Sequence, residues 1–237
     1  MRHVTTPTGN RLLDQLKQDE FAVLAPALQL ISLSMKQVIE APNVPITAIV
    51  FPVTGVLSVV ASATQNQQVE VGLIGHEGMS GTSVVLGNGQ SPNDTYVQIE
   101  GSAYVFPAND LRQAIQQSLA LHNTLLHYVQ SFLTQATHTA LANGRAKIEE
   151  RLARWLLMAQ DRIGRPDLPL THELISIMLG VRRPGVTEAL NSMEGLGLIK
   201  ATRGVLRVID RAGIEACANG WYGVPEAEYE RLMGSCR

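Results

Sequence analysis

The stretch 170–209 constrains the fold most strongly, because it combines two helical patterns, a glycine turn and a hairpin pattern within forty residues. Thr171 can cap a first helix by accepting from its free backbone N–H groups, and Gly180 can take the positive φ of a tight turn. A second helix is predicted from about Arg182, with Pro184 in its first turn, where the missing N–H removes no intrahelical bond. The stretch therefore predicts a helix-turn-helix.

A hairpin pattern follows the second helix directly. Residues 198–201 and 205–209 are predicted to be short strands, with Arg203 and Gly204 as the two-residue loop between them. Such a hairpin beside a helix that enters the major groove is a wing, and basic side chains on it suit phosphate contact. The basic residues of this segment are Lys200, Arg203, Arg207 and Arg211.

Two interpretations of this region are open. A helix pair with a hairpin can be an ordinary packed α+β subdomain, or it can bind DNA. The glycine turn, the outward-facing arginines and the basic hairpin agree with one another, and this agreement favours DNA binding. The side chains that we expect to contact DNA are Thr171, His172, Arg182, Arg183, Thr187, Glu188, Asn191 and Arg203.

The distribution of charge supports the same interpretation. The whole chain has a formal net charge of −2, but residues 143–212 contain twelve Lys and Arg against eight Asp and Glu. Residues 1–142 contain five against nine. The positive balance therefore coincides with the predicted helix-turn-helix, as expected of a domain that binds nucleic acid.

Several classes of protein are disfavoured by residues that the sequence lacks. The two cysteines, Cys217 and Cys236, cannot build a disulfide scaffold or a four-cysteine metal site within one chain. No Gly-rich phosphate loop or nucleophile elbow is present, and His76 stands alone in the β-rich region. We therefore expect no enzymatic activity and no metal. The N-terminus lacks a secretion-signal pattern, so a cytoplasmic location is expected.

The region before the helix-turn-helix predicts a β-domain and a long helix. Between residues 35 and 106 the hydrophobic period is two, with β-rich runs at 48–51, 56–61, 69–74 and 95–106. Short strands at this spacing predict an antiparallel barrel or jelly roll. We therefore expect an α+β chain with an N-terminal β-roll domain over 1–108, a dimerisation helix over 109–144 and a winged helix-turn-helix domain over 145–237.

The helix is expected to begin near Asp110, with Asn109 as its cap, and to break at Asn143 and Gly144. No Asp, Glu, Lys or Arg occurs from residue 113 to 144, but Gln, Asn and His recur too often for a membrane span. Packing against its own β-domain explains part of this pattern, since Leu125 and Phe132 lie beside the seam, but pairing with a second copy is favoured. The seam consists of Leu119, His122, Leu126, Val129, Leu133, Ala136 and Ala140.

The run LTHELISIMLGVRRPGVTEALNSMEGLGLI resembles the DNA-binding module of the Crp/Fnr family of bacterial transcription regulators. The phrases FPVTGVLSVV and VEVGLIGHEGMSG fit the β-roll sensor domain of that family. The resemblance implies a homodimer that binds double-stranded DNA at a palindromic operator and contacts RNA polymerase. Where the best-known relatives read bases with Arg, Glu and a second Arg, this chain has Arg183, Pro184 and Glu188, so a different operator is expected.

The resemblance also bears on effector binding. Cyclic-nucleotide-binding relatives have Gly-Glu and Arg-Ser where this chain has Gly81-Thr82 and Asn93-Asp94, so binding of cAMP is not expected. Backbone N–H groups of the glycine turn can still receive another small effector. The candidate effector residues are Gly78, Met79, Ser80, Gly81, Thr82, Asn93 and Asp94. Two alternatives remain: a constitutive DNA-binding dimer with a ligand-free sensor domain, and a nucleotide-sensing module that acts on a protein partner.

Overall fold

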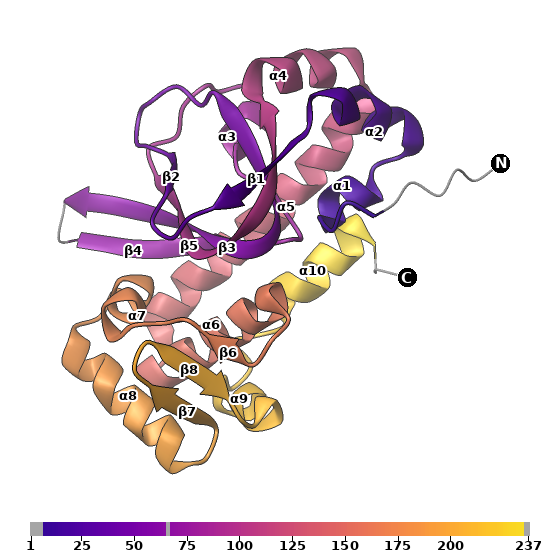
Figure 1. The fold of residues 1–237 in the computed structure, drawn as a ribbon. Helices are drawn as coiled ribbons and strands as arrows, with labels where there is room; N and C mark the ends of the chain where they lie inside the picture. Colours follow the sequence, from indigo (N-terminus) through magenta and orange to yellow (C-terminus); the bar gives the residue numbers. More distant parts are fainter. Residues whose placement is uncertain (1–6, 65–66, 235–237) are drawn as a thin grey trace. The chain divides into compact units, whose positions relative to one another are not determined.

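The computed structural model describes residues 7–64 and 67–234 and has an α+β fold (Figure 1). Cys236 lies outside the described residues. The helices are α1 (Arg11–Gln15), α2 (Gln18–Leu24), the 3₁₀ helix η1 (Ala25–Ala27), α3 (Thr82–Val85), α4 (Ala108–Gln117), α5 (Leu119–Arg145), α6 (Ile148–Ile163), α7 (His172–Leu179), α8 (Arg183–Gly195), α9 (Arg211–Cys217) and α10 (Val224–Met233). The strands are β1 (Gln29–Leu33), β2 (Val38–Glu40), β3 (Ala48–Thr64), β4 (Gln67–Ile74), β5 (Asp94–Pro107), β6 (Asp167–Leu168), β7 (Ile199–Thr202) and β8 (Val205–Val208).

The chain divides into two compact units. The first consists of the described residues of Met1–Leu57, Ile74–Gln130 and Arg231–Arg237, and the second of those of Ser58–Leu73 and Ser131–Glu230. Strand β3 and helix α5 each contribute to both units, so the units are not consecutive segments of the sequence.

The N-terminal strands form an antiparallel sheet, as the period of two predicts. The order is β1-β5-β3-β4, and β2 pairs with β5 beside this path. Strand β3 joins the two runs predicted at 48–51 and 56–61 into one, because Gly55 takes a φ of +84° within the strand instead of ending it. A Cβ at this position would lie 2.5 Å from the carbonyl oxygen of Ile99, so only glycine fits.

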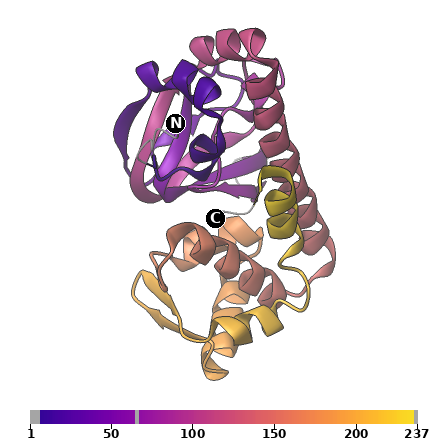
Figure 2. The ribbon, with the colours of Figure 1, turned by 90° about the vertical axis from the view of Figure 1, so that its right-hand side faces the viewer.

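The uncharged region forms two helices. Helix α4 begins at Ala108 with Pro107 at the N-cap, so the prediction that Asn109 caps it was wrong; the Asn109 Oδ1 instead accepts from Arg112. Helix α5 is continuous through Asn143 and Gly144 (Figure 2), which corrects the predicted break. A single glycine in a helix costs only about 1 kcal/mol, which packing can offset. Among the described residues, no helix is long and apolar enough to cross a membrane.

The second unit contains a small sheet and the predicted helix pair. Helix α6 is almost entirely buried over residues 152–159. The sheet has the order β6-β8-β7, and β6 pairs with β8 through Asp167↔Arg207 and Leu168↔Leu206. The sequence predicts the β7–β8 hairpin but not β6, because two residues are too short to show a strand period.

Candidate nucleic-acid interface

Helix α7 starts and ends as its sequence predicts. The Thr171 hydroxyl accepts from the N–H of Leu174 at 3.2 Å and caps the first turn. At the other end Gly180 adopts a φ of +59°, and its N–H donates to the carbonyl of Ile177. The N–H of Val181 donates to the Ser176 carbonyl in the same turn. The cap and the glycine turn together fix the angle at which the chain enters α8.

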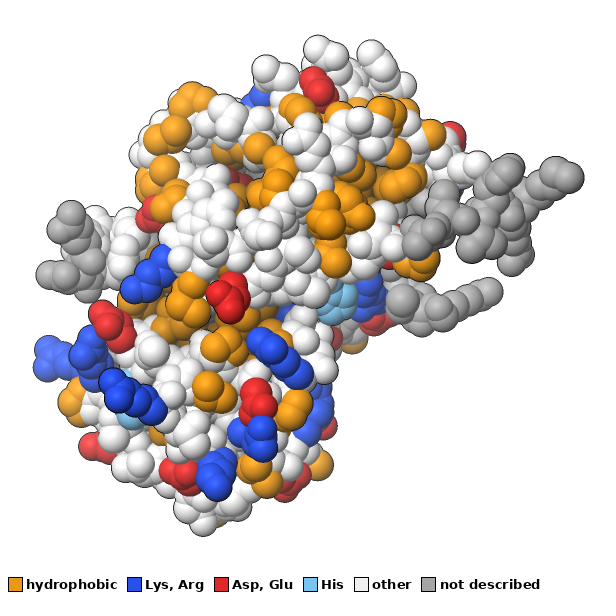
Figure 3. Space-filling view, in the orientation of Figure 1, with side chains coloured by type: hydrophobic (Ala, Val, Ile, Leu, Met, Phe, Trp, Pro, Cys, Tyr) orange, Lys and Arg blue, Asp and Glu red, His pale blue; other side chains and the backbone are white. Residues whose placement is uncertain are grey.

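Helix α8 buries one face and exposes the other. Its first turn contains Pro184, and Arg182 stands at the N-cap with an extended backbone. The buried stripe is Val186, Ala189, Leu190 and Met193, as the helical spacing predicts. On the opposite face Arg182, Arg183, Glu188 and Asn191 are exposed, and Thr187 is half-buried. Lys and Arg side chains gather over α7, α8 and the small sheet in Figure 3.

The structure brings several predicted DNA-contacting residues together at the start of α7 and α8. An Arg183 guanidinium nitrogen lies 3.0 Å from Glu173 Oε2, and both side chains are more than 60% exposed. The Thr187 hydroxyl lies 3.2 Å from the His172 Nδ1. The N-terminal ends of α7 and α8 therefore form one polar surface that faces solvent.

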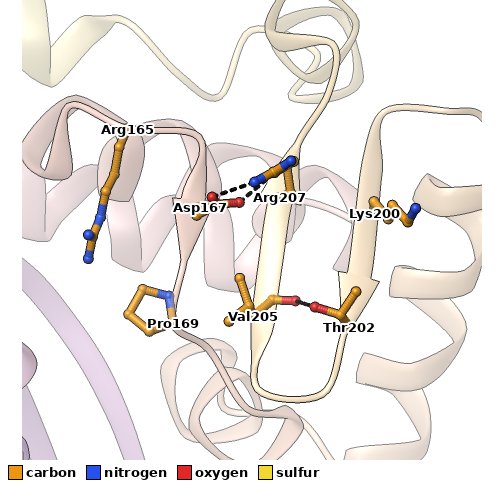
Figure 4. A pocket seen from close by; sticks show the side chains of 7 residues that line it. All are labelled: Arg165, Asp167, Pro169, Lys200, Thr202, Val205 and Arg207. Atoms are coloured by element: carbon orange, nitrogen blue, oxygen red, sulfur yellow. Dashed lines mark hydrogen bonds and ion pairs between the residues drawn. The ribbon is translucent and has the colours of Figure 1, made fainter.

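The wing has the predicted geometry, with the Arg203–Gly204 loop between β7 and β8 and a φ of +78° at Gly204. Arg203 is exposed at the tip. On the outer face of the sheet, Arg207 makes two hydrogen bonds of 2.6 Å to the Asp167 carboxylate (Figure 4). The hydrogen bond from Arg207 also lowers the pKa of Asp167. Arg207 is thus held in a bidentate pair across the sheet.

Arg211 is likewise bound within the chain. Its guanidinium lies 2.8 Å from the Asp161 carboxylate and 3.0 Å from the Glu215 carboxylate, and it donates to the hydroxyl of Tyr222 at 3.1 Å. The four basic residues that were expected to suit phosphate contact therefore differ in their partners within the chain. Arg207 and Arg211 neutralise carboxylates of their own unit, which leaves Lys200 and Arg203 as the cations of the wing.

The C-terminal tail, for which the sequence suggests no role, packs on α6. The indole N–H of Trp221 donates to the Glu150 carboxylate at 3.2 Å, and the Asn219 amide donates to the same carboxylate at 2.9 Å. The Tyr222 hydroxyl donates to Asp161 at 2.5 Å. The tail thereby supports the helix on which the helix-turn-helix rests.

The glycine turn proposed for effector binding is largely buried. Gly78, Met79, Ser80 and Gly81 are buried, whereas Thr82 is half-buried. The Tyr128 hydroxyl donates to the carbonyl of Met79 at 2.9 Å. A Cβ at Gly78 would lie 2.3 Å from the Tyr128 hydroxyl oxygen and 2.4 Å from its ring carbon Cε2, so the turn packs directly against α5.

A carboxylate of the chain itself accepts a hydrogen bond from this turn. The Gly81 N–H, which an anion would use, donates to Glu40 Oε1 at 2.6 Å. The Thr95 hydroxyl donates to the other carboxylate oxygen at 3.4 Å. Glu40 is only 7% exposed, and burial raises the pKa of this carboxyl above its ordinary range. Glu40 is not among the residues predicted from the sequence, where its one signal is that an acidic residue ends an apolar strand.

The remaining effector candidates, Asn93 and Asp94, lie at the start of β5 and are half-buried. The backbone N–H of Asn93 donates to the Ser91 hydroxyl at 3.1 Å. Within the described parts of the chain, no group of three or more His, Cys, Asp or Glu side chains gathers in a way that can hold a metal ion.

None of the seven seam residues of α5 is buried within the chain. Leu119 is 73% exposed and Leu133 is 54% exposed, and the other five are half-buried or exposed. The buried positions of α5 include Leu121, Leu125 and Tyr128, which face the first unit. The His122 side chain is hydrogen-bonded within the chain, with its Nε2 3.1 Å from the carbonyl oxygen of Val85. The helix thus has one face packed on its own chain and another that is open.

A β-roll sheet, a long helix and a winged helix-turn-helix define the fold class of transcription regulators with an N-terminal sensor-like domain. Residues 150–217 match the sequence profile of the Crp-like helix-turn-helix domain. The chain therefore contains a Crp-like helix-turn-helix domain and has the fold of a Crp/Fnr-type transcription regulator.

Solved structures with this fold cover most of the chain. A protein from Eubacterium rectale assigned to the Crp/Fnr family is 17% identical, with a TM-score of 0.71 over 90% of this chain and 100% of that chain. FixK2 from Bradyrhizobium japonicum is 17% identical, with a TM-score of 0.67 over 80% and 96%. The c-di-GMP-responsive regulator CLP from Xanthomonas campestris is 13% identical, with a TM-score of 0.66 over 81% and 99%. No curated protein matches the sequence.

Proposed function

We propose that this protein is a sequence-specific DNA-binding transcription regulator that acts as a homodimer on a palindromic operator. The observation that carries the proposal is the exposed polar face of α8, which lies beside the capped start of α7. Helix α8 would enter the major groove, and the wing tip at Arg203 would contact the backbone alongside. The net positive charge of residues 143–212 supports this assignment.

The exposed residues divide by chemistry into base-reading and phosphate-binding groups. Arg183 can donate two hydrogen bonds to O6 and N7 of a guanine, and Glu188 can accept from the amino group of a cytosine. The residues proposed for backbone contacts or for neighbouring bases are Thr171, His172, Arg182, Thr187, Asn191 and Arg203. Pro184 has no hydrogen-bonding side chain, so it would not read a base at the second base-reading position of the best-known relatives.

Dimerisation is proposed to use the open face of α5. Exposed leucines on a helix without charged residues between 113 and 144 are a liability in a monomer, and pairing with a second copy removes it. The seam remains Leu119, His122, Leu126, Val129, Leu133, Ala136 and Ala140. A symmetric dimer would place two α8 helices about 34 Å apart, one helical turn of DNA.

We propose that the chain is divided by function into three consecutive segments. Residues 1–108 form the sensor-like domain, 109–144 the dimerisation helix and 145–237 the DNA-binding domain. The partners are double-stranded DNA, a second copy of the chain and RNA polymerase, and the protein acts in the cytoplasm without catalysis. The effector would be a small molecule other than cAMP at Gly78–Thr82, Asn93 and Asp94.

One observation favours the second candidate function, a constitutive regulator with a ligand-free sensor domain. Glu40 takes the Gly81 N–H and repels any phosphate or carboxylate that approaches the same turn. An anionic effector would have to displace a buried carboxylate that already has its hydrogen bonds. Entry of such an effector is therefore coupled to movement of β2, which ends at Glu40.

Selection of duplexes from a random library by the purified protein tests both candidates. Recovery of a two-fold symmetric site is expected, and the Arg183→Ala variant should fail to enrich the same site. The selection is repeated with a bacterial small-molecule extract. Enrichment in its absence supports constitutive binding, and enrichment only in its presence supports an effector. Recovery of no sequence by a folded dimer under either condition would contradict the proposal.

A further inference from the structure

A small cavity lies within the second unit beside helix α6. Its volume is about 20 Å³, enough for one water-sized group. The cavity is lined from β4, the end of α5, α6 and the end of α7. Among its lining side chains are Glu70, Arg151, Arg154, Trp155 and Met178.

Arg154 lines this cavity as a buried cation whose nitrogens are not all hydrogen-bonded. It is only 5% exposed, and its Nε and Nη2 nitrogens are buried without a hydrogen-bond partner among the described residues. The Nε of Arg151, which lines the same cavity, is also buried and unpartnered. Burial lowers the pKa of Arg154, with the charge of Glu226 acting in the opposite direction. Buried guanidinium nitrogens without a hydrogen-bond partner are unfavourable, so these three nitrogens call for a bound group.

Among the described residues that line the cavity, Glu70 is the one carboxylate, and it already accepts hydrogen bonds. Glu70 Oε1 accepts from the indole N–H of Trp155 at 2.6 Å, and Oε2 accepts from the Ser58 hydroxyl at 2.5 Å. Among the described residues of the lining, two guanidiniums therefore stand against one carboxylate, an excess of one positive charge. Glu226, whose charge also acts on Arg154, does not line the cavity. A monovalent anion balances this charge, whereas a divalent anion would exceed it and a water molecule would leave it.

We propose that the cavity binds a compact monovalent inorganic anion, of the size of a halide ion, between Arg151 and Arg154. The site has a direct connection to the helix-turn-helix, because Arg151 Nη2 donates to the carbonyl of Leu179 at the end of α7. An anion that holds the Arg151 guanidinium thereby holds the C-terminal end of α7. The site thus makes the first helix of the DNA-binding motif dependent on a bound ion.

Trp155 lines the cavity and reports its occupancy. Trp221 is the second of the two tryptophans, so the Trp221→Phe variant leaves Trp155 as the single fluorophore. Iodide is titrated against this protein at constant ionic strength, with gluconate as the balancing anion. We expect quenching that saturates and that chloride reverses by competition. Arg154→Gln in the same background should weaken the saturable component about tenfold or more, as loss of a charge-assisted contact implies.

Two controls separate the site from general effects. Arg165→Gln removes an exposed arginine of the same unit that does not line the cavity, and it should leave the iodide curve unchanged. Acrylamide, a neutral quencher, should act equally on all variants that are folded. Should Arg154→Gln fail to fold, crystals of the wild-type protein grown with bromide test the site by anomalous scattering, with a peak expected between Arg151 and Arg154. Linear iodide quenching that chloride leaves unchanged, or water alone in the bromide crystals, would overturn the proposal.

Discussion

The ion pair between Arg183 and Glu173 should lower the affinity for DNA, because it competes with a base for the Arg183 guanidinium. Arg183 is proposed to read a guanine, but in the free protein its guanidinium lies 3.0 Å from Glu173 Oε2. The arginine must leave this partner to reach a base. The side chains are 63% and 68% exposed, so the pair is worth about 0.2–1 kcal/mol. Glu173→Gln removes this competition and should tighten operator binding by roughly 1.4- to 5-fold.

Fluorescence anisotropy with a labelled operator duplex measures this change. The matched control is Glu215→Gln, which removes a carboxylate also 3.0 Å from an arginine, Arg211, but on helix α9. It should leave the dissociation constant unchanged. In an Arg183→Ala background, Glu173→Gln should lose its effect, because no arginine remains to be released. The reasoning is refuted if Glu173→Gln weakens binding, or tightens it equally with and without Arg183.

Three further predictions concern the dimer, the glycine turn of the sensor-like domain and the helix-turn-helix. Leu133→Asp should raise the dimer dissociation constant at least about 100-fold, since a symmetric interface loses the leucine twice; sedimentation shows this, and Gln116→Asp should stay dimeric. Burial raises the pKa of Glu40, so its contribution to stability is present below pH 4.5 and is lost as pH rises through the folded pKa. Urea unfolding from pH 4 to 8 should therefore show wild type losing stability relative to Glu40→Gln, with Glu100→Gln as the control; a constant difference argues against this. Gly180→Val should lower the free energy of unfolding by about 1–3 kcal/mol because φ is +59°, and an unchanged urea midpoint would contradict it.

The helix-turn-helix could be predicted from sequence because its signals are local. Thr171 caps the helix that it precedes, Gly180 ends that helix, and the stripe that begins at Val186 repeats with the helical period. The hairpin follows for the same reason, since Arg203 and Gly204 form a loop between two adjacent strands. Each of these features depends on residues within a few positions of one another, so a single sequence displays them.

The features that sequence reasoning missed are pairs that are distant in the chain. Asp167 and Arg207 are forty positions apart, and their pairing both creates β6 and removes Arg207 from the free cations of the wing. Glu40 reaches Gly81 across forty-one positions. Neither pair has a local signature. From sequence alone, an acidic residue is expected to be exposed, because its partner is known only once the sheet topology is known.

The predicted cap and break of the long helix were wrong for a different reason. Asn109 and Gly144 have local preferences of about 1 kcal/mol, and such preferences are overridden by packing. Pro107 ends β5 and sets the start of α4, whereas the chain turns at residues 146–147, after Gly144. The N–H of Lys147 donates to the Glu150 carboxylate at 2.9 Å, which starts α6 at this point.

The central claim is that α8 reads base sequence while the wing tip binds the backbone. The most direct test measures binding to a panel of duplexes in which each base pair of the selected operator is replaced in turn. Arg183→Ala should cost about 1–3 kcal/mol on the intact operator and abolish discrimination at one symmetric pair of positions. Arg203→Ala should weaken binding to every duplex alike and leave discrimination intact. Equal, uniform losses for both variants across the whole panel would contradict the claim.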